Sequence, residues 1–280
     1  MKNKAALIIV TYNNWDKLSD CLISIYKHTN FPYHIFLIDN ASTDNTTVLY
    51  DKDYPNMTIV RNEENKWWSG GINQGIDLSK DYKYVFFLND DIVVGKSWLI
   101  NHLVPLQSPN IAGVGPHNSH PRDSQCYDNA MTKEYGKVYL PVIGDEVDRN
   151  DLDKMNELLY EHNLKNFPNR PYLNVIGMVA FFCVGFKREV IDQIGYLDEN
   201  LIMGGDDDDY CMRIKHETDL KMAILLNTYV IHNAGSSINK NGDKWKKEML
   251  DKNMDVHLYL IGKESPYSYN NLRIVCICLS

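Results

Sequence analysis

The stretch Tyr84–Ile92, YVFFLNDDI, predicts a buried strand that ends in polar and acidic side chains. Five apolar residues run up to Leu88, and Asn89, Asp90 and Asp91 follow at once. A continuous apolar run of this length is typical of a strand with both faces covered, as in a parallel sheet. In open α/β sheets, ligands bind beyond the carboxyl ends of the strands, so we expect chemistry at this point of the chain.

Neighbouring segments extend the same pattern. Short β-rich apolar runs alternate with helical periodicity, which predicts repeated βαβ units around a parallel sheet. Leu18, Cys21, Leu22 and Ile25 fall at i, i+3, i+4 and i+7 and predict a helix that packs on this sheet. Further strands are expected at residues 5–11, 34–39, 57–61 and 111–115, and a further helix at 96–104.

The rhythm breaks in the middle of the chain and then returns. Residues 117–172 are polar, acidic and proline-containing, and we interpret them as an insertion with one helix at 151–164. The apolar run 177–186, helices at 188–195 and after Asp207, and a strand at 228–232 resume the pattern. A last helix is expected after the lysine-rich segment 239–248. The chain is therefore predicted to be one large α/β domain with an insertion.

The composition excludes several classes of protein. With 280 residues, 44% hydrophobic and 24% charged, the chain is neither disordered nor fibrous. The 29 basic and 37 acidic residues give a net charge of −8, which excludes nonspecific nucleic-acid binding and leaves room for a small phosphate ligand screened by a metal ion.

Six scattered cysteines without a CxxC pair indicate a reducing, cytoplasmic chain. The apolar run near the N-terminus is too short for a signal peptide, and no stretch nears the roughly 20 apolar residues of a membrane span. We expect the lysines of 239–248 to lie on a solvated helix face and the apolar residues 272–279 to form a buried strand. A peripheral contact with a membrane is the alternative for both segments.

Two polar clusters follow the first two expected strands. Thr11–Asn14 and Asp39–Asp44 are expected to lie side by side at the rim of the sheet, where they offer hydrogen-bond partners to a base and a ribose. The alternative is that they form turns and helix caps, which Asn, Asp, Ser and Thr favour. We expect a cap for Asp44 and a ligand contact for Asp39.

The segment Asn65–Gly75, NKWWSGGINQG, is a further candidate. Its paired glycines are expected to open a helix and to present backbone amides to a phosphate or a sugar. Their spacing matches neither the dinucleotide fingerprint nor a P-loop. Trp67 and Trp68 either stack on a sugar or pack over the helix start, and the sequence leaves both interpretations open.

Two acidic turns and one histidine predict a divalent cation site. The adjacent carboxylates of Asp90 and Asp91 repel unless a cation joins them, so we expect Asp91 to be a ligand, with a capped turn as the alternative. His232 ends the strand at 228–232 and is the second candidate ligand, the alternative being a structural or exposed histidine. The second acidic turn, GGDDDD at 204–209, is expected to converge on the same ion and to supply a general base, with a merely solvated turn as the alternative.

In their order along the chain, these motifs resemble family 2 glycosyltransferases of the GT-A fold, the nucleotide-diphospho-sugar transferase fold, and most closely the rhamnosyltransferase-like branch. The resemblance covers residues 5–92 and 177–237. It implies an α/β fold with a mostly parallel central sheet flanked by helices and an inserted acceptor-side region. The motifs that carry it are IIVTYNN, FLIDNASTDNT, NKWWSGGINQGI, FFLNDDIVV, GGDDDDYCMRI and VIHNAGSS.

The resemblance also implies roles for individual residues. Nucleotide contacts are expected from Thr11, Tyr12, Asn13, Asp39, Asn73, Asn89 and Asp90. Contacts with the donor sugar or the acceptor are expected from Trp68, Gly70, Gly71 and Asp206. Asp91 and His232 are expected to bind Mg²⁺ or Mn²⁺, and Asp207 is expected to be the base. Asn89 departs from the family pattern, which has an acid there, and Trp67–Trp68 stands where relatives often have Gly-Phe.

The implied activity is the inverting, metal-dependent transfer of a sugar from a nucleoside diphosphate sugar, dTDP-rhamnose-like or a UDP-sugar, to a hydroxyl of a glycan, lipid-linked or other acceptor in polysaccharide biosynthesis. The chain then divides into a nucleotide-sugar-binding half at 1–116, an acceptor-side insertion at 117–172, a catalytic half at 173–238 and a C-terminal helical extension at 239–280. Two alternatives remain: a HAD-like phosphohydrolase that uses Asp39, although Ala41 stands where that class needs a second acid, and a noncatalytic sugar-nucleotide-binding protein.

Overall fold

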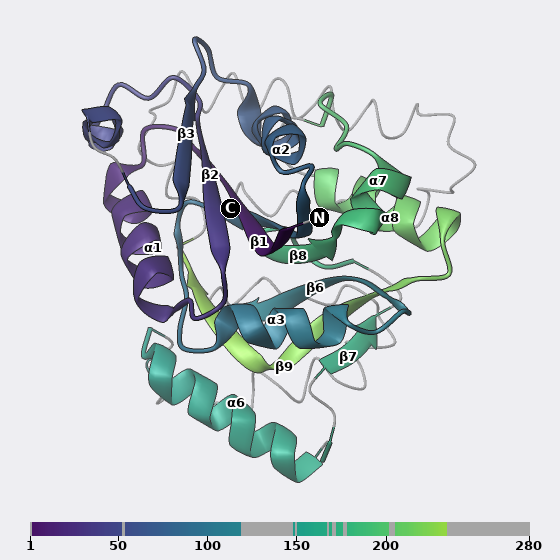
Figure 1. Ribbon diagram of the computed structural model, residues 1–280. Helices are drawn as coiled ribbons and strands as arrows, with labels where there is room; N and C mark the ends of the chain where they lie inside the picture. Colours follow the sequence, from purple (N-terminus) through teal and green to yellow (C-terminus); the bar gives the residue numbers. More distant parts are fainter. Residues whose placement is uncertain are drawn as a thin grey trace.

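One sheet organises the molecule. The computed structural model describes residues 2–51, 54–118, 148, 150–166, 168–169, 172–175, 178–201 and 205–233. Within these residues nine strands lie in the order β3-β2-β1-β4-β8-β6-β9-β5, with β7 paired to β9 (Figure 1). The strands are β1 (Lys2–Thr11), β2 (Tyr33–Asp39), β3 (Met57–Arg61), β4 (Tyr82–Asn89), β5 (Ile92–Val93), β6 (Ile111–Asn118), β7 (Tyr172–Val175), β8 (Cys183–Lys187) and β9 (Lys221–His232).

Most strands of this sheet point the same way. β3, β2, β1 and β4 pair in parallel. β8 runs antiparallel to both β4 and β6, and β6 pairs in parallel with β9. The strands β1, β2, β3, β4, β6 and β9 therefore share one direction, which confirms the predicted α/β fold with a mostly parallel sheet. Their carboxyl ends lie at one edge, which we call the carboxyl edge.

Helices cover both faces of the sheet, as Figure 1 shows. α1 (Trp15–His28) and α3 (Trp98–Leu106) pack into one apolar cluster, and α2 (Trp67–Leu78), α7 (Arg188–Ile194) and α8 (Asp206–Glu217) into the other. β1 serves both clusters because its side chains alternate: Leu7 and Ile9 face the first, Ile8 and Val10 the second. A 3₁₀ helix, η1 (Asn45–Asp51), follows β2, and α6 (Leu152–Asn166) contacts β9.

Two glycines bring α2 unusually close to β1. A Cβ atom on Gly75 would lie 2.2 Å from Cγ2 of Ile8, and one on Gly71 would lie 2.7 Å from Cγ1 of Val10. Neither distance is tolerable for packed carbon atoms, so both positions require the residue without a side chain. The helix therefore begins against the last residues of β1, directly beside the carboxyl edge.

The structure differs from the predicted elements mainly in strand lengths. β9 begins at Lys221, whereas the sequence predicts a strand at 228–232, because Asn227 and Thr228 interrupt the apolar run without ending the strand. β8 begins at Cys183 and is shorter than the apolar run 177–186. β5 and β7, of two and four residues, are too short to give a periodic signal.

The predicted insertion is described only in part. Its second half holds α6 and β7, and both contact β9, so this half adds to the main sheet. Residues 119–147, with Tyr127, Tyr135 and Tyr139, and the predicted extension at 239–280 lie outside the described residues. The division of the chain into four regions stays a prediction. Among the described residues, no helix combines the length and the apolar character that crossing a membrane requires.

Candidate functional site

The polar residues that follow the strands meet at the carboxyl edge, as the sequence predicts. Thr11, the last residue of β1, pairs in register with Asp39 of β2, and Val10 pairs with Asn89 of β4. Parallel pairing thus places three polar strand ends side by side. Tyr12 and Asn13 occupy the turn that leaves β1, and Asn13 adopts a left-handed backbone with φ of 49°.

The turns after β1 and β2 are joined by hydrogen bonds. The backbone N–H of Asn13 donates to Oγ of Ser42 over 2.9 Å, and Oδ1 of Asn13 accepts from the N–H of Thr43 over 2.8 Å. Oδ2 of Asp44 accepts from the N–H of Trp15, the first residue of α1, over 2.9 Å. Asp44 therefore caps α1 from the neighbouring turn, which confirms its predicted role.

Asp39 is a fully buried carboxylate, and only one of its two oxygens accepts a hydrogen bond among the described residues. Its exposed fraction is 0%, and its Oδ1 accepts from the N–H of Ser42 over 2.9 Å. Its Oδ2 is buried and has no hydrogen-bond partner among the described residues. Burial raises the pKa of Asp39, against the smaller effects of Ser42 and Arg61 that lower it. A buried acceptor without a donor is costly, so this oxygen is suited to a donor group of a bound ligand.

Both carboxylate oxygens of Asp90 accept hydrogen bonds from other side chains of the protein. Its Oδ2 accepts from the hydroxyl of Thr11 over 2.7 Å, and its Oδ1 accepts from the amide of Asn14 over 3.0 Å. Burial, and then the nearby charge of Asp91, raise the pKa of Asp90 to about 7. This carboxyl ties β4 to the end of β1 and the start of α1. Nucleotide contacts by Thr11 and Asp90 stay predictions.

Asp91 and His232 come from distant parts of the chain and lie together. Oδ1 of Asp91 is 3.4 Å from Nε2 of His232, and the amide nitrogen of Asn89 is 3.1 Å from the same Nε2. The short pairing of β5 with β9, Ile92 opposite His232, creates this neighbourhood. The ring of Phe182 stacks on the imidazole with centroids 4.8 Å apart and planes 16° from parallel, which fixes its orientation.

The two side chains fit a shared divalent cation. Two donor atoms that are each about 2.1 Å from one ion in octahedral or tetrahedral geometry lie about 3.0–3.4 Å from each other. The observed separation of Oδ1 of Asp91 and Nε2 of His232, 3.4 Å, falls at the upper end of that range. The side-chain amide of Asn89 also faces Nε2 of His232, so Asn89 and Asp91 both lie next to the ring nitrogen that would bind an ion.

The second acidic turn does not complete a three-residue metal centre. Among the described residues, no group of three or more His, Cys, Asp or Glu side chains is placed to hold a metal ion. The predicted convergence of both acidic turns on one ion stays a prediction. Asp206–Asp209 form the first turn of α8, where the helix dipole offsets the charge of the acids without a cation. Gly204 lies outside the described residues.

The four acids of this helical turn differ in their surroundings. Asp209 is buried and forms an ion pair with Nε of Arg213 over 2.8 Å. Oδ1 of Asp207 accepts from the N–H of Asp208 over 2.9 Å. Asp206 and Asp207 are partly exposed at the start of the helix. Asp209 is thus a structural anchor, and Asp207 remains accessible for chemistry.

We expect Asp208→Asn to stabilise the protein more at alkaline than at acidic pH. Burial, and then the charges of Asp207 and Asp209, raise the pKa of Asp208 to about 7, well above that of an unfolded aspartate. The folded state therefore holds a proton that the unfolded chain has lost, and wild-type stability falls as the pH rises from about 4 to about 7. Asparagine removes this pH dependence. The free energy of unfolding of Asp208→Asn relative to the wild type should therefore be about 1 kcal/mol higher at pH 8 than at pH 4, after allowance for solvent screening.

Urea unfolding of both proteins at pH 4 and pH 8 measures this difference. Asp20→Asn, at an exposed position of α1, is the control for the same change of side chain outside a buried acidic cluster. An Asp208→Asn gain that is the same at pH 4 and pH 8 would contradict the prediction.

Asn73 connects α2 to the loop that leads into α8. Its amide donates to the carbonyl of Leu197 over 3.0 Å and to Oε1 of Glu199 over 2.9 Å, and its Oδ1 accepts from the N–H of Leu197 over 3.0 Å. The hydroxyl of Ser69 donates to the carbonyl of Leu201 over 3.0 Å. These bonds position the chain just before the acidic turn, whereas the predicted nucleotide contact of Asn73 stays a prediction. Sequence reasoning missed Glu199, which no local pattern marks.

Trp68 packs inward from the start of α2. Its ring contacts Phe87 and Phe181, with centroids 6.4 Å away in each case. This geometry favours the packing interpretation, and contacts of Trp68, Gly70, Gly71 and Asp206 with a sugar stay predictions. Sequence reasoning also missed Asn62, which exchanges amide hydrogen bonds with Gln74 and follows β3 directly. The rule that polar residues after strands deserve notice would have found it.

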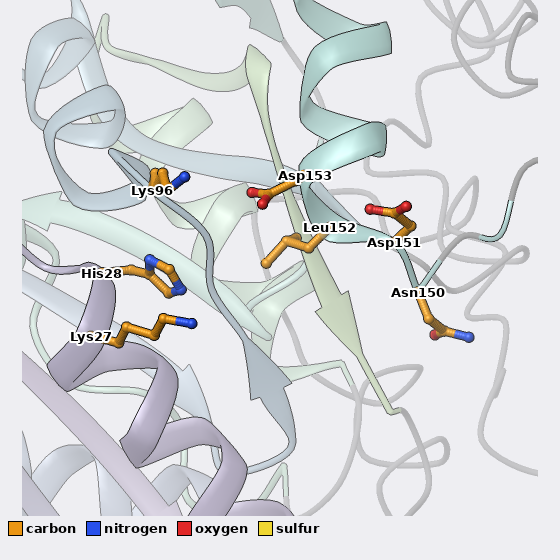
Figure 2. Close-up of a pocket in the computed structure, with 7 residues that line it drawn as sticks. All are labelled: Lys27, His28, Lys96, Asn150, Asp151, Leu152 and Asp153. Atoms are coloured by element: carbon orange, nitrogen blue, oxygen red, sulfur yellow. The ribbon is translucent and has the colours of Figure 1, made fainter.

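A surface pocket of about 370 Å³ lies elsewhere on the molecule. Figure 2 shows Lys27 and His28 of α1 on one side of it, and Leu152 and Asp153 of α6 on the other. α1 begins at the carboxyl edge, and its 14 residues span about 20 Å, so its last turn lies far from that edge. The pocket is therefore not part of the site.

Comparisons with known proteins point to one family. The sequence model described as "Glycosyl transferase family 2" matches residues 6–195, more than half of the chain. The low-salt glycan biosynthesis hexosyltransferase Agl10 of Haloferax volcanii is 24% identical over 225 residues, 78% of this chain and 63% of that protein. The O-antigen chain rhamnosyltransferase RfbN of Salmonella typhimurium LT2 is 32% identical over 113 residues, 40% of this chain and 36% of that protein.

Solved structures share the fold. A crystal structure of GalNAc-T7 with UDP, GalNAc and Mn²⁺ matches 82% of this chain and 44% of its own, with a TM-score of 0.59 at 15% identity. At this identity the likeness concerns the fold alone. The alignments span between 16% and 63% of the lengths of the curated relatives.

Proposed function

The chain belongs to glycosyltransferase family 2, and on this basis we propose that it moves a sugar from a nucleoside diphosphate sugar to a hydroxyl group of a glycan or lipid-linked acceptor. One observation carries the proposal: Asp91 and His232 lie 3.4 Å apart at the carboxyl edge where β2 ends in the buried Asp39. An acid and an imidazole that fit one divalent cation suit a diphosphate, and a buried carboxylate oxygen suits a base or ribose donor.

The nucleotide would lie across the carboxyl edge. Asp91 follows β4, and β1 and then β2 are the next strands along the sheet. With its diphosphate at Asp91, the nucleotide therefore extends its ribose and base across the ends of β1 and β2. Asp39 then accepts a hydrogen bond through its Oδ2, and Tyr12 and Asn13 flank the nucleoside. Mn²⁺ or Mg²⁺, held by Asp91 and His232, would supply positive charge to stabilise the departing diphosphate.

The chemical step is a single displacement with inversion. The acceptor oxygen forms a bond to the anomeric carbon while the bond from that carbon to the diphosphate oxygen breaks. The proton of the acceptor hydroxyl passes to the carboxylate of Asp207, which is partly exposed at the first turn of α8. Asn73 and Glu199 hold the loop before this turn, so they help to position the base.

The donor and the acceptor define the finer parts of the proposal. A dTDP-rhamnose-like sugar or a UDP-sugar is proposed as donor, and residues 117–172 as the acceptor side. The similarity to a rhamnosyltransferase supports the first, and the general tendency of loops beside a rigid sheet to carry specificity supports the second. A noncatalytic sugar-nucleotide-binding protein is the second candidate, which Asn89 favours because it stands in place of an acid.

A screen of donors and acceptors tests the function. The purified protein is mixed with individual nucleoside diphosphate sugars and with glycan or lipid-linked acceptors, in Mn²⁺ and in EDTA. We expect release of nucleoside diphosphate that requires a matching acceptor and stops in EDTA. Donor binding without turnover over a broad acceptor panel would favour the noncatalytic candidate, and release of phosphate from simple phosphoesters would favour the phosphohydrolase.

A further inference from the structure

The two proposed metal ligands meet where a very short strand pairs with a long one. Asp91 directly precedes β5, which has two residues, and His232 is the last residue of β9. The register of these strands places Ile92 opposite His232 and extends over one further residue pair. A ladder of two pairs is weak by itself, so further contacts have to hold the two ligands together.

Asn233, the residue after His232, supplies such a contact. Its backbone N–H donates to the carbonyl oxygen of Asp91 over 3.0 Å, and Nδ2 of its side-chain amide donates to the same oxygen over 3.1 Å. A carbonyl oxygen has two lone pairs and accepts both bonds. Two hydrogen bonds therefore join the main chain of one proposed ligand to the residue next to the other.

Other hydrogen bonds hold the residues on either side of Asp91. The N–H of Asn89 donates to the carbonyl of Phe182 over 2.9 Å, and the N–H of Val94 donates to Oγ of Ser24 over 3.1 Å. Neither of these bonds reaches β9, which carries His232. The bonds from Asn233 differ from them because they join this turn to the end of β9 at Asp91 itself.

The side chain at position 233 decides whether the second bond forms. Any residue except proline would donate the backbone N–H, whereas the amide bond requires a side-chain donor that reaches the carbonyl of Asp91. Oδ1 of Asp91 and Nε2 of His232 are 3.4 Å apart, already at the upper end of the range that fits one ion. A small movement of the two segments away from each other would therefore take the pair out of this range.

We propose that the side-chain amide of Asn233 is a positioning group of the metal site, which keeps Asp91 and His232 at the separation that one divalent cation needs. The inference rests on the proposed function and adds a residue that acts through the two ligands. Groups that orient metal ligands contribute strongly to metal affinity although they do not bind the ion. The amide of Asn233 therefore sets how tightly the site holds Mn²⁺ or Mg²⁺.

Calorimetric titration of the full chain with Mn²⁺ alone tests the assignment. Asn233→Ala removes the amide, and Asn233→Leu replaces it with a side chain of the same branching that has no donor. A loss shared by both variants therefore reports the missing hydrogen bond rather than a cavity. We expect both variants to bind Mn²⁺ about 10- to 100-fold more weakly than the wild type, the usual effect of removing a group that orients a metal ligand.

Asn101→Ala is the matched control, because the amide of Asn101 also donates to β9, to Oγ1 of Thr228 over 2.9 Å, but away from the end that carries His232. It should leave the Mn²⁺ affinity within about twofold of the wild type, as expected for an independent position. Urea unfolding in EDTA checks that each variant folds.

Three results would overturn the inference while the proposed function stands. They are an unchanged Mn²⁺ affinity of the two Asn233 variants, an equal loss for Asn101→Ala, and failure of both Asn233 variants to fold, which would make the amide a purely structural group. If the wild type itself binds no Mn²⁺, the metal site of the proposed function fails, which is a distinct result.

Discussion

Asp207→Asn should lower kcat by about 10²- to 10⁴-fold, the usual contribution of a general base. Asparagine has the same shape as aspartate and can accept a hydrogen bond, but it cannot take the proton of the acceptor hydroxyl. The N–H of Asp208 still finds an oxygen acceptor in the variant, so the first turn of α8 is preserved. Donor affinity should therefore change less than about twofold. Initial rates at saturating donor and acceptor, with calorimetry for the donor, separate the two effects.

Asp208→Asn is the control that distinguishes the two neighbouring acids. Burial and the charges of Asp207 and Asp209 raise the pKa of Asp208 to about 7, a value that would also suit a base near neutral pH. Because our mechanism assigns the proton transfer to Asp207, we expect substitution of Asp208 to change kcat by less than about tenfold. A large loss for Asp208→Asn together with a small loss for Asp207→Asn would assign the base to Asp208 and contradict our assignment.

The layout of the fold could be predicted because it follows from periodicity and strand ends. The runs around Leu7, Leu37 and Leu88 predict buried strands, and the helical spacing of Leu18 to Ile25 predicts α1. Strand lengths were harder, since β9 continues through Asn227, whose polar side chain interrupts the pattern while its backbone stays paired. Pairing over long sequence distances depends on tertiary contacts, so β5 beside β9 leaves no trace in local sequence.

The candidate site could be predicted in its location and less so in its details. The rule that ligands lie beyond strand ends found Asp39, Asp91 and His232, which the fold brings to one edge. The same rule does not say where a side chain points. Asp90 and Asn73 sit in equally promising positions, yet their polar atoms bind the protein's own groups. Such pairings are decided by side-chain orientation and by loops such as the one with Glu199, which carry no periodic signal.

Asp91→Asn should abolish the dependence of nucleotide binding on a divalent cation. In the wild type, we expect nucleoside diphosphate affinity to be higher in Mn²⁺ than in EDTA, because Asp91 and His232 are placed to hold the ion that offsets the diphosphate charge. Substitution of a group that merely supports a ligand typically costs 10- to 100-fold in metal affinity, so loss of a carboxylate ligand should cost at least about that much. Calorimetry in Mn²⁺ and in EDTA measures the difference for each variant.

His232→Gln should also abolish the dependence of nucleotide binding on the divalent cation, because Asp91 and His232 are proposed to bind the same ion. Agreement between the two variants is a stronger test than either variant alone. Were Asp91 important only for the fold, its loss would lower affinity equally in Mn²⁺ and EDTA, and His232→Gln would not reproduce it. Asp153→Asn, an acid of the pocket far from the carboxyl edge, should leave the ratio of the two affinities unchanged. A wild-type nucleotide affinity that is the same in Mn²⁺ and in EDTA would mean that Asp91 and His232 hold no ion. The site would then bind the diphosphate through other groups, with the contact between Asn89 and His232 unchanged.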